Sequence, residues 1–180
     1  TASHKLTAII KEAFGYIGEN VGSGTTEYDV AQFIRRRLVQ EGLLVTDGPV
    51  VAVNEHTSDP HFDPTFDTAR QIRKGDWVLI DLWSRLAGEN TMFSDITWTA
   101  YVGLHVPDEH QRVFDVVVNA RDAAVREMEH AFESGKMAAG WQIDKVARDY
   151  INKTEYGAFF NHRLGHNIGR EVHGNGVNLD

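Results

Sequence analysis

Hydrophobic residues recur every three or four positions in four segments of the chain, which is the spacing of helices that bury one face. Glycines follow the first three segments, and the first ends before VGSG at 21–24. Thr25 or Thr26 is placed to cap the second helix. We therefore predict helices over 6–17, 25–42, 107–135 and 141–154.

Three other segments have the composition of strands. PVVAVN and WVLIDLW are almost continuous apolar runs, and SDITWTAYVG alternates between apolar and polar residues. Between the first two lies EHTSDPHFDPT, a polar segment with prolines and histidines, and loops of this kind often carry function. We predict strands over 49–54, 77–83 and 94–103, a loop over 55–65, and a new extended segment after the last helix.

The order of these elements suggests a unit of structure that begins to repeat. Segments 24–31 and 140–147 both start with Gly and end with Val-Ala, and a long helix precedes each. Duplication is one interpretation, with halves at about 1–106 and 107–180, and chance similarity between two amphipathic helices is the other. A duplicated second half would lack its own strand pair, so we expect the chain to be incomplete at its C-terminal end.

Composition and charge exclude several classes of protein. The 180 residues suffice for one domain with a sizeable core, and 42% of them are hydrophobic. The net charge of −8 argues against nucleic-acid binding, and no basic tract or long apolar run suits a membrane. The absence of cysteine is compatible with the cytoplasm and leaves His, Asp and Glu as metal ligands. Such ligands favour manganese, cobalt, iron or a nitrogen/oxygen zinc site.

Two aspartates lie on the neighbouring predicted strands. Asp81 sits within WVLIDLW, where a charge should be buried and should need a cation, hydrogen bonds or a raised pKa. A hairpin centred on Gly88 would place Asp81 directly opposite Asp95, and a bound cation would relieve their repulsion. The alternative is that one aspartate caps a turn and the other bonds to the backbone. We interpret the pair as metal ligands.

The stretch FNHRLGHNIGREVHG at 160–174 contains three histidines. His162 and His166 are four apart, like two zinc ligands on a helix, but that motif requires Glu where Arg163 stands. Its glycines would cost a helix about 1 kcal/mol each. A zinc helix is therefore excluded, and these histidines need carboxylate partners from elsewhere.

Four segments together resemble the pita-bread metallopeptidases, the family of methionine aminopeptidase, aminopeptidase P and prolidase. They are DPHFDP, GDWVLIDLW, SDITWTAYVG and HRLGHNIGREVHG. The similarity spans nearly the whole chain and is greatest to the proline-directed members. It implies an α+β fold of duplicated αβ units around a curved antiparallel sheet, here as one catalytic domain over 1–180 with an incomplete second half.

The resemblance also implies roles for six residues. The family binds two divalent metal ions, of which we expect manganese, with cobalt, zinc or iron as alternatives. Two Glu ligands of the family have no counterpart in these 180 residues. His56 and His4 match nothing and are expected to be solvated. Taken singly, each matching histidine could equally be a surface or packing residue. The implied metal ligands are Asp81, Asp95 and His166, and the implied catalytic histidines are His61, His173 and His162.

The implied activity is hydrolysis of the N-terminal peptide bond of Xaa-Pro peptides or dipeptides by a hydroxide that bridges the two metals. A peptide is then the partner, and a homodimer is compatible with the sequence. Without the two Glu ligands we expect the chain alone to be inactive or nearly so. Two alternatives stay open, a creatinase-like hydrolase of non-peptide C–N bonds and a catalytically dead protein-binding module on the same fold.

Overall fold

The computed structural model describes residues 1–45 and 47–180. These form two units, the first made of 1–105 with 168–172 and the second of 106–167 with 173–180. The first unit contains the elements α1 (Ala2–Asn20), α2 (Glu27–Gln40), β1 (Val50–Val53), the 3-10 helix η1 (Asn54–Ser58), β2 (Trp77–Ser84) and β3 (Ser94–Tyr101). The second contains α3 (Asp108–Glu133), α4 (Gly140–Asn152) and the 3-10 helix η2 (Gly157–Phe159).

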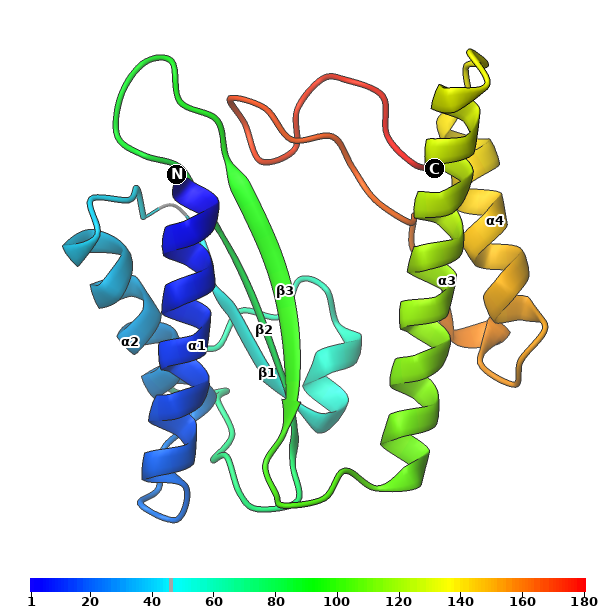
Figure 1. Ribbon diagram of the computed structural model, residues 1–180. Coiled ribbons are helices and arrows are strands. Elements are labelled where there is room, and N and C mark those ends of the chain that lie inside the picture. Colours follow the sequence, from blue (N-terminus) through cyan, green and yellow to red (C-terminus); the bar gives the residue numbers. More distant parts are fainter. Residues whose placement is uncertain (46) are drawn as a thin grey trace. The chain divides into compact units, whose positions relative to one another are not determined.

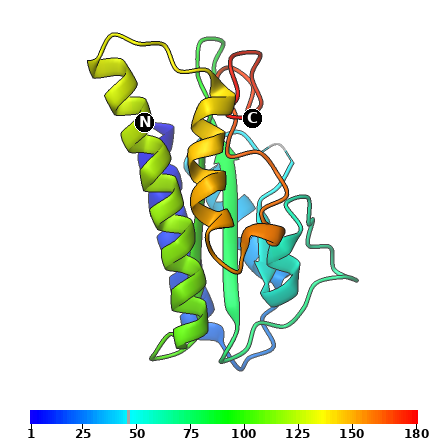
Figure 2. The same cartoon turned by 90° about the vertical axis from the view of Figure 1, so that its right-hand side faces the viewer.

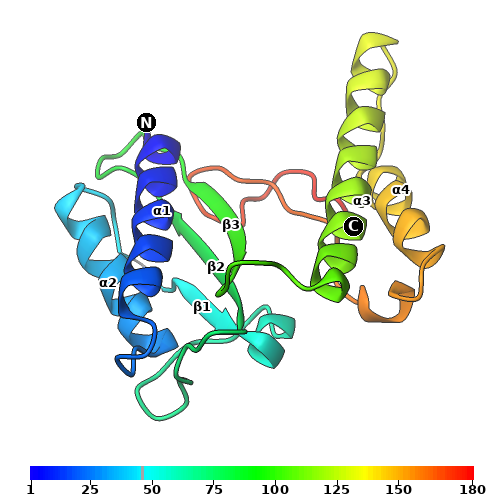
Figure 3. The ribbon, with the colours of Figure 1, turned by 60° about the horizontal axis from the view of Figure 1, so that its bottom comes forward.

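Helices α1 and α2 of the first unit lie side by side along one face of its sheet (Figures 1 and 3). Helix α1 buries Leu6, Ile9 and Ile10, which the three-to-four spacing predicted. Helix α2 begins with a capping box, in which Thr26 accepts from the backbone N–H of Asp29 and the Asp29 side chain accepts from that of Thr26. Their buried faces form one core with the sheet.

The sheet is antiparallel, in the order β1-β2-β3. Strand β2 buries every second side chain, namely Val78, Ile80, Leu82 and Ser84. The first three of these belong to the core shared with the helices, so the side chains between them lie on the opposite face of the sheet. The nearly unbroken apolar run is thus a strand with two different faces. The predicted loop at 55–65 begins instead inside η1.

In the second unit, α3 and α4 pack together around small residues (Figure 2). Ala120 and Ala124 of α3 meet Ile143, Ala147 and Ile151 of α4. Residues 153–180 contain η2 and a single bridge between Gly165 and Leu179. The extended segment predicted after the last helix therefore does not form a strand. A Cβ at Gly140 would lie 1.8 Å from the carbonyl oxygen of Asn178, so only glycine permits this close approach.

Among the helices of the described residues, none has both the length and the apolar character needed to cross a membrane.

Candidate metal centre and the segments that carry its histidines

The strands β2 and β3 place Asp81 and Asp95 on the same face of the sheet. Asp81 pairs with Thr97, and Asp95 pairs with Trp83. The predicted register, with the two aspartates directly opposite, is therefore wrong by two residues. A shift of two preserves the face because side chains alternate with a period of two. The two residues become diagonal neighbours, for which ordinary sheet geometry gives a spacing of about 7–8 Å, and somewhat less between the Cβ atoms.

Asp81 was predicted to be buried, and this is also wrong. It lies on the face of β2 away from α1 and α2 and is half-buried, as is Asp95. The hydroxyl of Thr97, its cross-strand partner, donates a hydrogen bond of 2.7 Å to Asp81 Oδ1.

The predicted catalytic residue His61 lies in the exposed loop after η1. The carboxylate of Asp59 accepts a hydrogen bond of 2.9 Å from the His61 backbone N–H. The carbonyl of Asp59 accepts a further one, of 3.1 Å, from the N–H of Phe62. The Phe62 ring packs on the ring of His56, with centroids 4.1 Å apart. A short turn is therefore held on both sides of His61.

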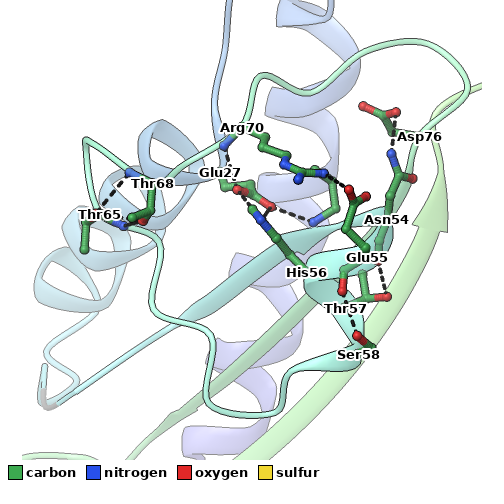
Figure 4. A network of polar contacts seen from close by, with 11 residues as sticks. Glu27, Asn54, Glu55, His56, Thr57, Ser58, Thr65, Thr68, Arg70 and Asp76 are labelled. Carbon is green, nitrogen blue, oxygen red and sulfur yellow. Dashed lines mark hydrogen bonds and ion pairs between the residues drawn. The ribbon is translucent and has the colours of Figure 1, made fainter. Parts of the chain in front are cut away.

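His56 is not solvated, contrary to expectation, whereas His4 is exposed as expected. The side chain of His56 is 19% exposed, and its Nδ1 lies 2.9 Å from Oε1 of the fully buried Glu27 (Figure 4). Because an ionised carboxylate only accepts hydrogen bonds, Nδ1 carries the proton. The Glu27 carboxylate also accepts bonds of 2.7 Å from the backbone N–H groups of Val53 and Arg70.

In the second unit the rings of His166 and His173 lie edge to face, with centroids 4.4 Å apart. Nδ1 of His166 lies 3.1 Å from the carbonyl oxygen of Asn167. A carbonyl only accepts, so Nδ1 carries the proton and Nε2 the lone pair of the neutral ring. Metal-binding histidines are commonly oriented by such a bond on their other ring nitrogen. His162 makes the same kind of contact, of 2.7 Å, to the carbonyl of Arg163.

The segment that carries His162 is fastened to α4 by an ion pair. Arg148 donates to both carboxylate oxygens of Asp144, at 2.7 and 2.9 Å, and to the carbonyls of Phe160 and His162, each at 2.9 Å. Asp144 also accepts a bond of 2.8 Å from the backbone N–H of Leu164. The hydrogen bond from Arg148 is the main cause that lowers the pKa of Asp144 below its ordinary value.

Part of the histidine stretch belongs to the first unit. The carbonyl of Gly169 accepts a bond of 2.9 Å from the N–H of Phe93, the residue before Ser94 at the start of β3. Arg170 donates to the carbonyl of Glu89 at 2.6 Å. The chain between His166 and His173 is thus joined to the segment that leads into the strand carrying Asp95.

The structure brings the predicted residues together only in part. Asp81 and Asp95 share a face, and His166 and His173 are in contact, but no group of three or more His, Asp or Glu positioned to hold a metal occurs among residues 1–45 and 47–180. The donor types, two carboxylates and an imidazole with its proton on Nδ1, are those of a nitrogen/oxygen metal site.

Sequence reasoning missed the residues that hold the loops. Glu27 stands in the first turn of a helix, where glutamate is usually solvated, so nothing in the sequence marked its burial. Asp144 and Arg148 are four apart on a predicted helix, and this i,i+4 spacing was an available signal.

Comparison with known proteins settles the family. Residues 2–179 match the profile of metallopeptidase family M24. The chain belongs to this family. It is 33% identical over 156 residues to the Xaa-Pro dipeptidase of Lactobacillus helveticus, a match that covers 85% of the chain and 39% of that enzyme.

Solved structures of the M24 peptidases agree with this assignment. A dipeptidase from Pyrococcus horikoshii superposes with a TM-score of 0.76 at 27% identity, covering 99% of the chain and 46% of its own. A prolidase from Thermococcus sibiricus gives 0.74 at 29% identity, with the same coverages of 99% and 46%. The predicted pita-bread fold is confirmed. The chain spans less than half the length of these relatives.

Proposed function

We propose that the protein containing this chain hydrolyses the N-terminal peptide bond of substrates with proline in the second position. The assignment to metallopeptidase family M24 and the relatives that act on Xaa-Pro dipeptides support the reaction class. The observation that carries it to a site is the shared face of Asp81 and Asp95 on the sheet of the first unit.

Asp81, Asp95 and His166 would contribute ligands to two divalent metal ions. The fit rests on donor chemistry, because carboxylate oxygens and a neutral imidazole suit manganese and similar ions. Such ions would lower the pKa of a bound water and so supply a nucleophile near neutral pH. Further ligands must complete the set, since the described residues do not assemble three in one place.

The chain's own residues would bind and orient the peptide. His61, exposed on its loop, would bond to the substrate amide, and His173, also exposed, would bond to the oxygen that gains charge during attack. His162 would add a polar contact in the pocket, and the Arg148 contacts to the carbonyls of Phe160 and His162 fix its backbone. Each role requires a ring N–H placed before the substrate arrives.

Metal uptake is the first test, because the isolated chain is expected to show little turnover. Manganese is titrated into the metal-free chain by calorimetry, with Asp95→Asn as the variant and Asp149→Asn as the matched control. Asp149 is an exposed aspartate on α4 whose partner is Lys145, far in sequence from the candidate ligands. We expect uptake by the chain and the control, and an affinity at least tenfold lower in Asp95→Asn. Equal affinity in both variants would refute the ligand assignment.

A substrate panel tests the reaction itself in the longest natural protein that contains the chain. Xaa-Pro dipeptides, longer Xaa-Pro peptides, matched Xaa-Ala peptides and creatine are compared with and without manganese. Metal-dependent release of the first residue only before proline supports the proposal. Turnover of creatine alone would identify a creatinase-like hydrolase, and no turnover with intact metal uptake would favour a binding module.

A further inference from the structure

Glu27 is the centre of a hydrogen-bond network that joins four parts of the first unit (Figure 4). Its carboxylate, fully buried at the first residue of α2, accepts hydrogen bonds from three donors. They are the backbone N–H groups of Val53 at the end of β1 and of Arg70, and Nδ1 of His56 in η1. The Glu27 backbone N–H in turn donates to the carbonyl of Arg70 at 3.0 Å. A buried carboxylate needs this many donors, because each oxygen has lost its water.

The side-chain donor to Glu27 is the imidazole of His56, while the guanidinium of Arg70 makes its ion pair elsewhere. The Arg70 side chain pairs with the exposed Glu55, so Arg70 serves Glu27 through its backbone N–H. His56 therefore supplies the side-chain donor, and the two contacts of Nδ1, at 2.9 and 3.1 Å to the two carboxylate oxygens, fix the plane of its ring.

The ring of His56 packs against the turn formed by residues 59–62. Phe62 packs on it with an interplanar angle of 31°, and the N–H of Asp59 donates to the carbonyl of His56 at 3.2 Å. Asp59 then holds the backbone N–H of His61. A continuous chain of contacts thus runs from the buried carboxylate to Asp59 and Phe62, one on each side of the exposed His61.

We propose that Glu27 and His56 are positioning residues for His61. The Glu27 carboxylate orients the imidazole of His56, the imidazole seats Phe62, and the turn over 59–62 then presents His61 in one backbone conformation. The catalytic role of His61 rests on the proposed function, whereas the proposal that the network orders the turn over 59–62 does not. Exposed polar turns otherwise sample several conformations. The network therefore adds to the order that the bonds of Asp59 within the turn supply.

Three variants of the isolated chain separate the steps. His56→Asn keeps an N–H donor for Glu27 and removes the ring, Phe62→Ala leaves the Glu27–His56 pair intact, and His56→Phe keeps a ring and removes the donor. The control is His4→Asn, on the exposed side of α1. Backbone ¹⁵N relaxation of residues 59, 61 and 62 is measured for each, because Pro60 has no N–H. The order parameter of an ordered segment is about 0.85.

We expect order parameters below about 0.6 at residues 59, 61 and 62 in all three variants, with values elsewhere unchanged and the control like the parent. A turn that stays ordered in His56→Asn or Phe62→Ala would overturn the role of the ring. A turn that stays ordered in His56→Phe would overturn the role of Glu27. If a variant fails to fold, the other two still decide, because each breaks a different contact.

The effect on catalysis is tested by steady-state kinetics of the natural protein that contains the chain. We expect Phe62→Ala to lower kcat at least tenfold with KM changed less than twofold, because the other proposed substrate contacts remain and only the presentation of His61 is altered. An unchanged kcat with a disordered turn would overturn the positioning role. Absence of Xaa-Pro hydrolysis in the parent would refute the proposed function, while the relaxation data would still decide whether the network orders the turn.

Discussion

Each unit contains a buried carboxylate on the second helix of its helix pair. Glu27 begins α2 in the first unit, and Asp144 lies in the first turns of α4 in the second. Both accept from a backbone N–H far along the chain, at Arg70 and Leu164, and both hold a segment that carries a histidine. They differ in their side-chain partner, which is His56 for Glu27 and Arg148 for Asp144.

The difference concerns how each charge is compensated. Asp144 has a permanently charged guanidinium four residues along its own helix, so the pair is assembled as soon as α4 forms. Glu27 has donors from β1, η1 and Arg70, which meet only when the unit folds, together with the favourable field at the start of α2. The charge of Asp144 is therefore compensated by a contact within one helix, whereas that of Glu27 is compensated by contacts that depend on the tertiary structure.

The largest effect is expected for Glu27→Gln. The amide nitrogen of Gln would face a donor, so at least one buried N–H loses its acceptor, and we expect a loss of about 3 kcal/mol in the free energy of unfolding. Denaturant unfolding measures it, with Glu19→Gln at an exposed position of α1 as the control. A loss below about 1 kcal/mol would mean that Glu27 is not the centre of the network.

Arg148→Lys should cost somewhat less, about 2 kcal/mol, because one ammonium cannot replace four directed bonds to Asp144, Phe160 and His162. The same unfolding measurement applies. Lys145→Met is the matched control, since Lys145 pairs with Asp149 at the same spacing on the same helix but is exposed, and it should cost about 0.5 kcal/mol or less. Equal losses in the two variants would show that burial adds nothing to the Arg148 pair.

The Asp144 pair should also give the second unit a characteristic pH dependence. The folded-state pKa of Asp144 is lowered from 3.8, mainly by the hydrogen bond from Arg148, so the stabilisation is complete above about 3.8. It is lost as the pH falls through the lower folded value. The stability difference between the parent and Asp144→Asn should therefore be constant at neutral and mildly acidic pH and shrink below 3.8.

The smallest effect is expected at Asp81, a carboxylate held in part by an exposed hydroxyl. Thr97→Val removes the donor to Asp81 Oδ1 and keeps a β-branched side chain on the strand, so the expected loss is about 0.5 kcal/mol. Thr99→Val, on the same strand and face, is the control, and denaturant unfolding compares the two. A loss above about 1.5 kcal/mol would mean that the hydrogen bond to Asp81 stabilises the fold as strongly as those to the buried carboxylates of Glu27 and Asp144.

Most of the fold could be predicted from periodicity. The apolar spacing in α1 and the strand pattern of β2 survive any tertiary environment, because a helix or strand needs a buried face whatever covers it. The exact pairing did not follow. Gly88 lies near the middle of the turn between β2 and β3, yet the pairing is centred one residue later, because turn composition does not set the register.

The candidate site divides in the same way. The residue types of Asp81, Asp95 and His166, and the family to which they point, could be read from four short segments, and the match over 2–179 confirms that family. The burial of Glu27 and its partnership with His56 could not be predicted, because the donors to Glu27 lie 26, 29 and 43 residues away along the chain.

The sequence by itself determined where most helices and strands form and the family resemblance, and it led to the prediction of Asp81, Asp95 and His166 as metal ligands, since all of these depend on local composition and order. Only the tertiary structure decided that Asp81 and Asp95 are diagonal neighbours on one face, that Glu27 is fully buried, and that His56 is its partner. The reason is physical: burial and strand register are set by the free energy of packing whole elements together, and that free energy is shared among residues far apart in the chain.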